Sequence, residues 1–554
     1  MPRHPLRIIL TLLATACSLS GVAQGSTSVE CGTVIVPTGL GSSTPTVLGS
    51  LSTLFTSSLY THQVISQVLR PLVWFGADGK PDWPRGAAAA VKTPDDGLHF
   101  VVTLHDRRWS DGVPITSDDL LFTLGLLRRL GPNYVNYGTG GMPTLVASER
   151  ALDAHRVELT MTRKVNPSWF VSVGLGNLFT LFPRHVFDGL SLVELRRRQN
   201  DPTLFAVGDG PFRIAEYSIG RHLILEPNPY WGGKPPQARR LVVSFPSGNT
   251  ALEQLRSDQL DSASIPYLLS GFAARIPGFH AVVRPSNATY GMGVINFRSA
   301  RAPFLRDLTV RRAIARSIDQ KEIVALVFHG FGSTNQGPVP RVLTGSLSPA
   351  ARAGYPDLSF DPVAAGVLLD GAGWHMTANG VREKDGRKLA FEIVTAQESP
   401  AGLLMAQVIQ RDLARVGVAV SLHVIGFNQL LATMLGNGHE WDVATLNWTV
   451  ETYPDVHDFF AADGTQNYGH YRDPAMDRLT NEEMFGSGDA ALFAVQDFAA
   501  EQVPFFYLPS GTPPVLARDG LDGMAEFLTA DGMWAAEEIT LSGPLACPAE
   551  ATRG

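Results

Sequence analysis

The chain has 554 residues, a formal net charge of −7 and 18% charged residues. It is mildly acidic and carries no basic stretch, so its charge gives no support for a nucleic-acid partner. The length corresponds to about three to four ordinary domains, which is enough for sizeable hydrophobic cores.

The first 25 residues have the layout of a secretory signal peptide. Basic residues precede the apolar run 6–16, and small and polar residues follow it as far as Gly25. This run is too short to cross a bilayer as a permanent helix. We therefore expect residues 1–25 to be removed and the protein to be periplasmic or extracellular. The alternative is a lipid anchor at Cys17, which ends the lipobox-like sequence Ala-Thr-Ala-Cys.

Cysteine usage fits an exported protein. The chain has three cysteines, and once Cys17 is removed or lipidated, Cys31 and Cys547 remain near its two ends. In an oxidising compartment such a pair is a candidate disulfide if its Cα atoms approach within about 7 Å. Two free thiols are the alternative. No Cys or His cluster has the spacing of a zinc site, so we expect no metal centre and no cofactor.

The N-terminal part predicts strands, turns and one clearly marked helix. Residues 32–36 form a β-branched run that is typical of a strand. Residues 59–72 carry apolar side chains at helical spacing. Thr116 and Asp119 have the spacing of a capping box, which predicts the start of a helix over 117–129.

The stretch 208–236 combines a hairpin with an aromatic corner. It opens with Gly-Asp-Gly-Pro, which predicts a sharp turn, and residues 212–217 and 223–225 then predict two antiparallel strands. Tyr230 and Trp231 lie between clusters of proline and glycine. A packed corner of the fold is the simplest interpretation of these two rings.

The C-terminal half alternates strands and helices. Residues 290–296 and 442–447 predict strands, and residues 418–424 predict one of the kind that pairs in parallel. Asp361-Pro362 and Ser399-Pro400 mark the starts of helices between them. Repeated βα units indicate an α/β fold with an open, partly parallel sheet, in which ligands bind beyond the strand ends.

A group of candidate binding residues follows the predicted strand 442–447. The chain there reads Asn447, Trp448, Thr449, Val450, Glu451, Thr452, Tyr453, Pro454 and Asp455. An indole ring on which a ligand can stack, followed by carboxylates in a turn, suits a cleft at the end of a strand. A solvated acidic turn is the alternative interpretation.

The sequence carries no motif of a common enzyme class. It has no G-x-S-x-G, no G-x-x-x-x-G-K-[ST] and no H-E-x-x-H. We therefore assign no catalytic residue and expect a protein without enzymatic activity. The alternative is an exported hydrolase whose catalytic residues come from distant parts of the chain.

Two stretches resemble a known family. They are residues 95–124, DDGLHFVVTLHDRRWSDGVPITSDDLLFTL, and residues 208–236, GDGPFRIAEYSIGRHLILEPNPYWGGKPP. Both resemble the bacterial extracellular solute-binding proteins of family 5, the peptide- and nickel-type receptors of ABC importers. The resemblance runs from about residue 34 to residue 508. One departure is His105, where the family usually has Arg or Lys.

The resemblance implies a two-lobed periplasmic-binding-protein fold of type II, with mixed sheets flanked by helices. Lobe I would comprise residues 26–289 and 496–554, with an extra subdomain at about 77–204, and lobe II residues 290–495. The lobes would close over a peptide or similar solute by hinge motion. A monomer would then deliver this solute to the membrane permease. A receptor for nickel chelates or sugars on the same fold is the alternative.

The resemblance also implies a ligand anchor. The family's W-x-x-D-Y motif has an aspartate that binds the ligand's α-ammonium group. Counting from Trp448 places this position at Glu451, whereas counting back from Tyr453 places it at Thr452. We add Asn447 and Asn296, which lie at the ends of predicted strands, as candidate ligand contacts.

Overall fold

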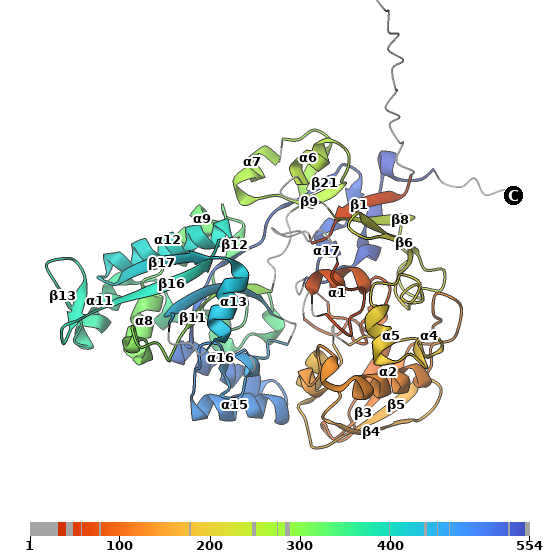
Figure 1. Ribbon diagram of the computed structural model, residues 1–554, viewed down its shortest axis with the longest axis horizontal. Coiled ribbons are helices and arrows are strands. Elements are labelled where there is room, and N and C mark those ends of the chain that lie inside the picture. The colour runs from red at the N-terminus through yellow and green to blue at the C-terminus, as the bar shows by residue number, and fades with distance from the viewer. Residues whose placement is uncertain are drawn as a thin grey trace, which may run out of the picture.

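The computed structural model has two lobes (Figure 1). It describes residues 31–548 apart from 40–47, 57, 77–78, 177–178, 246–250, 274, 283–287, 398, 437–439, 451–452, 465 and 530–531. The predicted signal peptide with Cys17, and the candidate anchors Glu451 and Thr452, lie outside the described residues.

Lobe I contains a four-stranded sheet in the order β1-β8-β7-β6. Its strands are β1 (Thr33–Pro37), β6 (Phe212–Ser218), β7 (His222–Pro227) and β8 (Arg240–Ser244). β1 runs parallel to β8, whereas β6 and β7 form the predicted hairpin. Val34 and Val36 are fully buried, as expected for a β-branched strand that packs on a core.

A smaller sheet of lobe I has the order β10-β21-β9. Its strands, and the short pair that follows in sequence, are β9 (Ser262–Ser264), β10 (Phe279–Val282), β21 (Val515–Arg518), β22 (Leu521–Asp522) and β23 (Thr540–Leu541). β21 comes from the C-terminal part of the chain and lies between two strands that precede lobe II in the sequence. The C-terminal segment therefore completes lobe I.

A separate antiparallel sheet has the order β2-β3-β5-β4. Its strands are β2 (Ala88–Lys92), β3 (His99–Leu104), β4 (Val146–Ala151) and β5 (Arg156–Met161). Helix α2 (Ser117–Leu130) packs against β4 and β5. The backbone N–H of Thr116 donates to the Asp119 carboxylate at 3.0 Å, which confirms the predicted capping box. We propose residues 77–204 as the inserted subdomain that contains this sheet.

The helix predicted over 59–72 is shorter than expected. α1 (Leu59–Ile65) ends early, and the next residues form turns. The carbonyls of Gln67 and Val68 accept hydrogen bonds from the backbone N–H groups of Phe212 and Gly210, at 2.9 and 2.8 Å. Backbone hydrogen bonds to the 208–212 turn thus take the place of the helical hydrogen bonds that the apolar spacing predicted. The remaining helices of lobe I are α3 (Pro167–Trp169), α4 (Arg184–Phe187), α5 (Leu192–Arg197), α6 (Ala251–Arg256), α7 (Ser270–Ala273) and α17 (Met524–Phe527).

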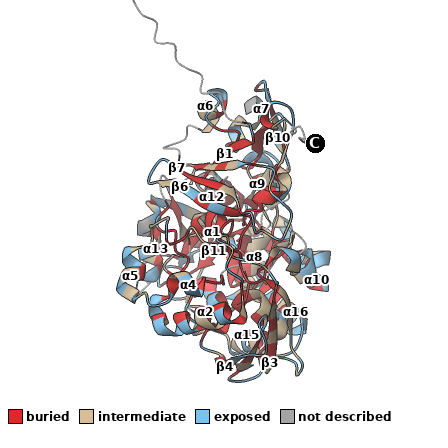
Figure 2. Cartoon of the chain, turned by 90° about the vertical axis from the view of Figure 1, so that its right-hand side faces the viewer, coloured by how far each residue is buried: buried red, intermediate tan, exposed pale blue. Residues whose placement is uncertain are grey.

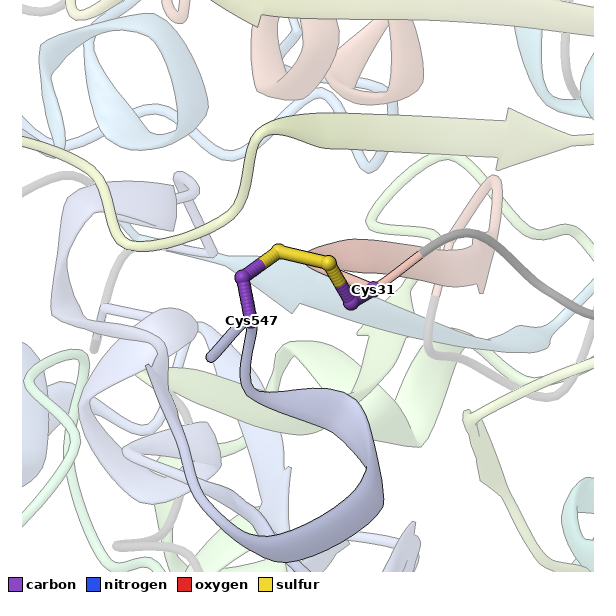
Figure 3. The surroundings of a disulfide bond; sticks show 2 residues. All are labelled: Cys31 and Cys547. Atoms are coloured by element: carbon purple, nitrogen blue, oxygen red, sulfur yellow. A yellow bond between two sulfur atoms is a disulfide. The ribbon is translucent and has the colours of Figure 1, made fainter. Parts of the chain in front are cut away.

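A disulfide joins the two ends of the described chain in lobe I (Figure 3). Cys31 and Cys547 have Cα atoms 4.8 Å apart, which confirms the predicted pair. Next to the bond, the N–H of Gly32 donates to the carbonyl of Leu545 at 2.8 Å. The disulfide therefore fixes the start of β1 to the C-terminal segment.

Lobe II is built on a five-stranded mixed sheet in the order β17-β16-β18-β11-β19. Its strands are β11 (Thr289–Ile295), β16 (Ala390–Ala396), β17 (Ala419–Ile425), β18 (Val443–Thr449) and β19 (Phe505–Leu508). β16 pairs in parallel with β17 and β18, which confirms the parallel pairing predicted for residues 418–424. β11 is antiparallel to both of its neighbours.

Helices flank this sheet. They are α8 (Leu308–Arg316), α9 (Gln320–Leu326), α10 (Pro349–Ala353), α11 (Pro362–Gly371), α12 (Pro400–Arg415), α13 (Phe427–Leu435), α14 (His457–Phe460), α15 (Pro474–Phe485) and α16 (Ala490–Gln502). Short strands complete the lobe: β12 (Gly332–Ser333), β13 (His375–Met376), β14 (Arg382–Lys384), β15 (Arg387–Lys388) and β20 (Ser510–Gly511). None of the helices among the described residues is long and apolar enough to cross a membrane.

The chain passes from lobe I to lobe II between β10 and β11, and it returns between β20 and β21. The expected boundary at residue 495 falls inside α16, and β19 still pairs with β11 in the sheet of lobe II. We therefore propose that lobe II extends to about residue 511, where β20 ends. The cause is that α16 and β19 form one more helix–strand unit of that sheet.

The buried core is divided between the lobes. One large cluster fills lobe I, and two clusters belong to lobe II. Figure 2 shows buried stretches in the interior, whereas helices such as α5 and α10 carry much exposed surface. Tyr453 and Leu492 of lobe II are buried members of the cluster of lobe I, and Met484, Phe485 and Phe493 pack against it. The lobes are therefore in direct contact at that place.

Candidate functional site

The predicted binding residues lie where β11 begins and β18 ends. Trp448 is opposite Tyr290, and Asn447 is opposite Gly291. Trp448 is half-buried, and its ring meets that of Phe459 edge-on with centroids 4.9 Å apart. Asn447 is exposed. Because successive side chains of a strand point to opposite faces, the indole and the exposed amide lie on opposite faces of this strand end.

Gly291 in β11 lies where the backbone and Asn447 leave no room for a side chain. A methyl group at Gly291 would lie 2.8 Å from the carbonyl oxygen of Pro509 and 3.4 Å from Oδ1 of Asn447. On the neighbouring pair, the hydroxyls of Thr289 and Thr449 are 3.0 Å apart. The hydroxyl pair and the Asn447 amide are hydrogen-bonding groups on the rim of the sheet.

The structure does not bring Asn296 together with these residues. It follows the other end of β11, five residues past Gly291, which corresponds to about 17 Å along a strand. Its side chain is 1% exposed and donates to the carbonyl of Trp441 at 2.7 Å. Its Oδ1 accepts from the N–H of Arg298 at 2.9 Å. These contacts indicate that Asn296 holds the backbone, and its role as a ligand contact stays a prediction.

Tyr453 lies between the lobes. Its side chain is 6% exposed, and its hydroxyl is 3.5 Å from Nδ2 of Asn166 in lobe I. It lines a cavity of about 330 Å³ to which both lobes contribute. The lining residues are Gly79, Lys80, Pro81, Pro167, Ser168, Val171 and Ser172 from lobe I, and Gly345, Ser346, Tyr453, Asp489 and Leu492 from lobe II. Ligand sites commonly occupy such positions between domains.

Carboxylates surround Tyr453. Burial, followed by the charges of Glu483 and Asp455, raises the pKa of its hydroxyl, which stays protonated. Asp455 accepts a hydrogen bond from Nε1 of Trp169 in lobe I at 2.8 Å. Asp455 is thus half-buried and bonded to lobe I, a contact that a solvated acidic turn does not predict. Asp458, by contrast, is exposed.

The sequence did not reveal the residues of lobe I that meet this segment. The backbone N–H of Asn166 donates to the carbonyl of Met484, and its side chain reaches two further carbonyls of lobe II. The available signal was the pair Asn166-Pro167, which is typical of the cap and first residue of a helix. That signal predicts a helix start, but it does not predict a partner in another lobe.

The strand end offers an indole on one face and hydroxyls and an amide on the other, and its backbone can pair with an extended chain. Trp448, Asn447, Thr289 and Thr449 are not among the lining residues of the cavity beside Tyr453. Among the residues that the structure describes, no three His, Cys, Asp or Glu side chains gather in a way that could hold a metal ion.

The family model "Bacterial extracellular solute-binding proteins, family 5 Middle" matches residues 84–470. The chain belongs to this family. The match covers well over half of the sequence and includes both stretches that carried the resemblance. Like the other members, this solute-binding protein has a two-lobed, mixed α/β fold.

Individual relatives agree with this family. The oligopeptide-binding protein AppA of Bacillus subtilis is 24% identical over 485 residues, which cover 86% of each chain. The solved structure of AppA with a nonapeptide superposes with a TM-score of 0.69, at 19% identity, over 92% of this chain and 99% of AppA. NikA of Brucella suis, solved with Fe(III)-EDTA, gives a TM-score of 0.74 at 19% identity, over 92% of this chain and all of NikA.

Proposed function

We propose that this protein is the substrate-binding component of an ABC importer and that it captures a short peptide or similar small solute between its lobes. The observation that carries the proposal is the cavity lined by both lobes beside Tyr453, in a chain of a solute-binding family. Oligopeptide-binding relatives such as AppA support a peptide as the ligand. Nothing in the relatives favours the alternative of an exported hydrolase.

In this proposal Trp448 forms one wall of the site. Its half-buried ring is held edge-on by Phe459, so one part of the indole remains available for stacking. From the opposite face of the strand, Asn447 and the paired hydroxyls of Thr289 and Thr449 supply hydrogen bonds to a peptide backbone. Ligands of this kind bind the closed form better than the open form, because contacts with both lobes exist only when the lobes meet.

The proposed anchor for a cationic group of the ligand is Glu451, with Thr452 as the competing position. The described residues on either side are Val450, directly after β18, and Tyr453 at the contact between the lobes. Counting along the family motif from Trp448, or back from Tyr453, gives position 451 or 452 for the anchor. A carboxylate there would pair with an N-terminal ammonium group in a partly desolvated cleft.

We further propose that the protein acts outside the cytoplasm as a monomer and gives its solute to a membrane permease. The signal-peptide layout of residues 1–25 supports export. The disulfide between Cys31 and Cys547 is consistent with an oxidising compartment.

The test starts with the protein purified under native conditions. The protein is denatured, and the released solute is identified by mass spectrometry. Calorimetry then measures the binding of that solute to stripped protein. The proposal expects a peptide or similar small solute that binds one per chain. A nickel chelate or a sugar would support the alternative receptor, and the absence of any solute that rebinds would contradict the proposal.

A further inference from the structure

The two lobes meet through a compact set of buried contacts far from their covalent connections. We call the contact of Asn166 and Trp169 with residues 453–455 and 483–488 the clasp. Figure 1 shows α15 at the lower edge of lobe II, whereas β9 and β21, beside the crossing of the chain, lie near the top of lobe I. The clasp is thus on the side where the lobes must separate when the hinge opens.

Asn166 joins three points of lobe II to lobe I. Its backbone N–H donates to the carbonyl of Met484 at 2.8 Å. Its Nδ2 donates to the carbonyl of Glu483 at 2.9 Å and to that of Gly488 at 3.1 Å. Its Oδ1 meanwhile accepts from the N–H of Ser168 at 3.0 Å and caps α3. The asparagine is fully buried, so these bonds are shielded from water.

Aromatic side chains complete the clasp. The indole N–H of Trp169 donates to the carboxylate of Asp455 at 2.8 Å, and the ring of Trp169 lies 6.4 Å from that of Phe485. The guanidinium of Arg163 stacks over the ring of Phe485 at 3.9 Å. The end of α15 is therefore covered by side chains of lobe I.

Glu483 is the unusual residue of this contact. Its side chain is fully buried, and neither of its carboxylate oxygens has a hydrogen-bond partner. A buried carboxylate without donors is strongly disfavoured, whereas a neutral carboxyl group is tolerated. Burial, and then the charge of Asp455, raises the pKa of Glu483 well above its ordinary value of 4.5.

The other titratable groups around the clasp do not offset this effect. The nearest groups are the carboxyl groups of Asp455 and Asp489 and the protonated hydroxyl of Tyr453, and burial raises the pKa of Asp455 as well. His457 lies beside Asp455, and its Nε2 is 3.4 Å from the carboxylate of Asp463. Arg163 faces the ring of Phe485. Since Asp455 has the Trp169 N–H as a donor and Glu483 has none, the proton belongs on Glu483.

We propose that the clasp sets the balance between the open and closed lobes, and that closing it takes up one proton on Glu483. When the lobes separate, water reaches the end of α15, and Glu483 returns to its ordinary acidity. This proposal rests on the hinge motion of the proposed function. Asn166 and Glu483 act on closure, and neither needs to contact the solute.

The sign of the pH effect follows from this proton uptake. Below the pKa of the open form Glu483 is protonated in both forms, and the balance does not change with pH. Above it, and up to the raised pKa of the closed form, the closed form holds one more proton. The ratio of closed to open molecules then falls about tenfold for each unit of rising pH. Acid therefore favours closure.

The experiment measures the distance between the lobes in the protein without solute. Fluorophores are attached to cysteines introduced at Asp106 in lobe I and Asp357 in lobe II, which are 93% and 100% exposed. Single-molecule energy transfer then gives the closed fraction between pH 5 and pH 8. Because no ligand is used, the result is independent of the calorimetric test of the proposed function.

The expected results differ among four proteins. The closed fraction falls with rising pH in the wild type and in Glu482→Gln, a matched control on the exposed face of α15. It does not change with pH in Glu483→Gln, and it is low throughout in Asn166→Ser. If Glu483→Gln does not fold, Glu483→Leu serves as a second uncharged variant. A wild type whose closed fraction does not change with pH, or a Glu483→Gln protein that follows the wild type, would overturn the proposal.

Discussion

Replacing Asn166 by serine removes the side-chain donors that join the lobes while keeping a good cap for α3. The two lost bonds run from Nδ2 to the carbonyls of Glu483 and Gly488, at 2.9 and 3.1 Å. Each is worth about 0.5–1.5 kcal/mol, so the closed form should lose about 1–3 kcal/mol. Since these bonds exist only when the lobes meet, the loss reduces closure and not the stability of either lobe.

At about 1.4 kcal/mol per factor of ten, this loss weakens the apparent affinity about 5- to 150-fold. Calorimetry with the solute released from the native protein measures the change. Asn133→Ser is the matched control, because Asn133 is exposed in lobe I and its side chain donates to the carbonyl of Leu130 in the same lobe. The melting temperature should stay close to that of the wild type, because serine is also a good helix cap. Equal affinities for Asn166→Ser and wild type would refute this reasoning.

Three further predictions concern the anchor, the indole and the disulfide. In calorimetry, Glu451→Gln should weaken binding of a cationic solute by about 3–5 kcal/mol, a factor of about a hundred to several thousand. Asp458→Asn changes an exposed side chain and should alter the binding free energy by less than about 1 kcal/mol. Trp448→Phe should abolish most of the fluorescence change on binding, and an undiminished change would place the responding ring elsewhere. Cys547→Ser removes a disulfide that joins residues 516 positions apart. Denaturant unfolding should then show a free energy of unfolding that is lower by several kcal/mol, at most about 6. An unchanged free energy of unfolding would contradict this prediction.

Local signals in the sequence predicted much of the fold. The box of Thr116 and Asp119 marks the start of α2, because the carboxylate satisfies the N–H of the capping residue. The 208–236 stretch predicts the β6–β7 hairpin, because its turn residues accept unusual backbone angles. Each of these signals depends on neighbours within a few residues, so one sequence is enough to detect it.

Long-range pairing explains what the sequence could not predict. The helical pattern of 59–72 continues beyond α1, yet Gln67 and Val68 pair with the turn at 208–212 instead. The backbone carbonyl of Glu483 accepts a hydrogen bond from Asn166, which is 317 residues away along the chain. A glutamate in a helix normally predicts an exposed position, so no local pattern could have identified this one.

The candidate site was predicted in part. Trp448 and Asn447 do lie at the end of a strand of the lobe II sheet, as the alternation of strands and helices suggested. Tyr453 proved to be a contact between the lobes, and Asn296 lies at the opposite end of β11. The sequence predicts which residues end a strand, but the depth of each side chain depends on packing from the other lobe.

The central claim is that this protein binds a small solute between its lobes and releases it unchanged. Native mass spectrometry tests this claim most directly. The stripped protein is mixed with the identified solute and measured at once, and again after a day at working temperature. The claim predicts one solute per chain at both times and a free solute of unchanged mass. Fragments of the solute that accumulate with time in proportion to the protein would contradict it and identify a hydrolase.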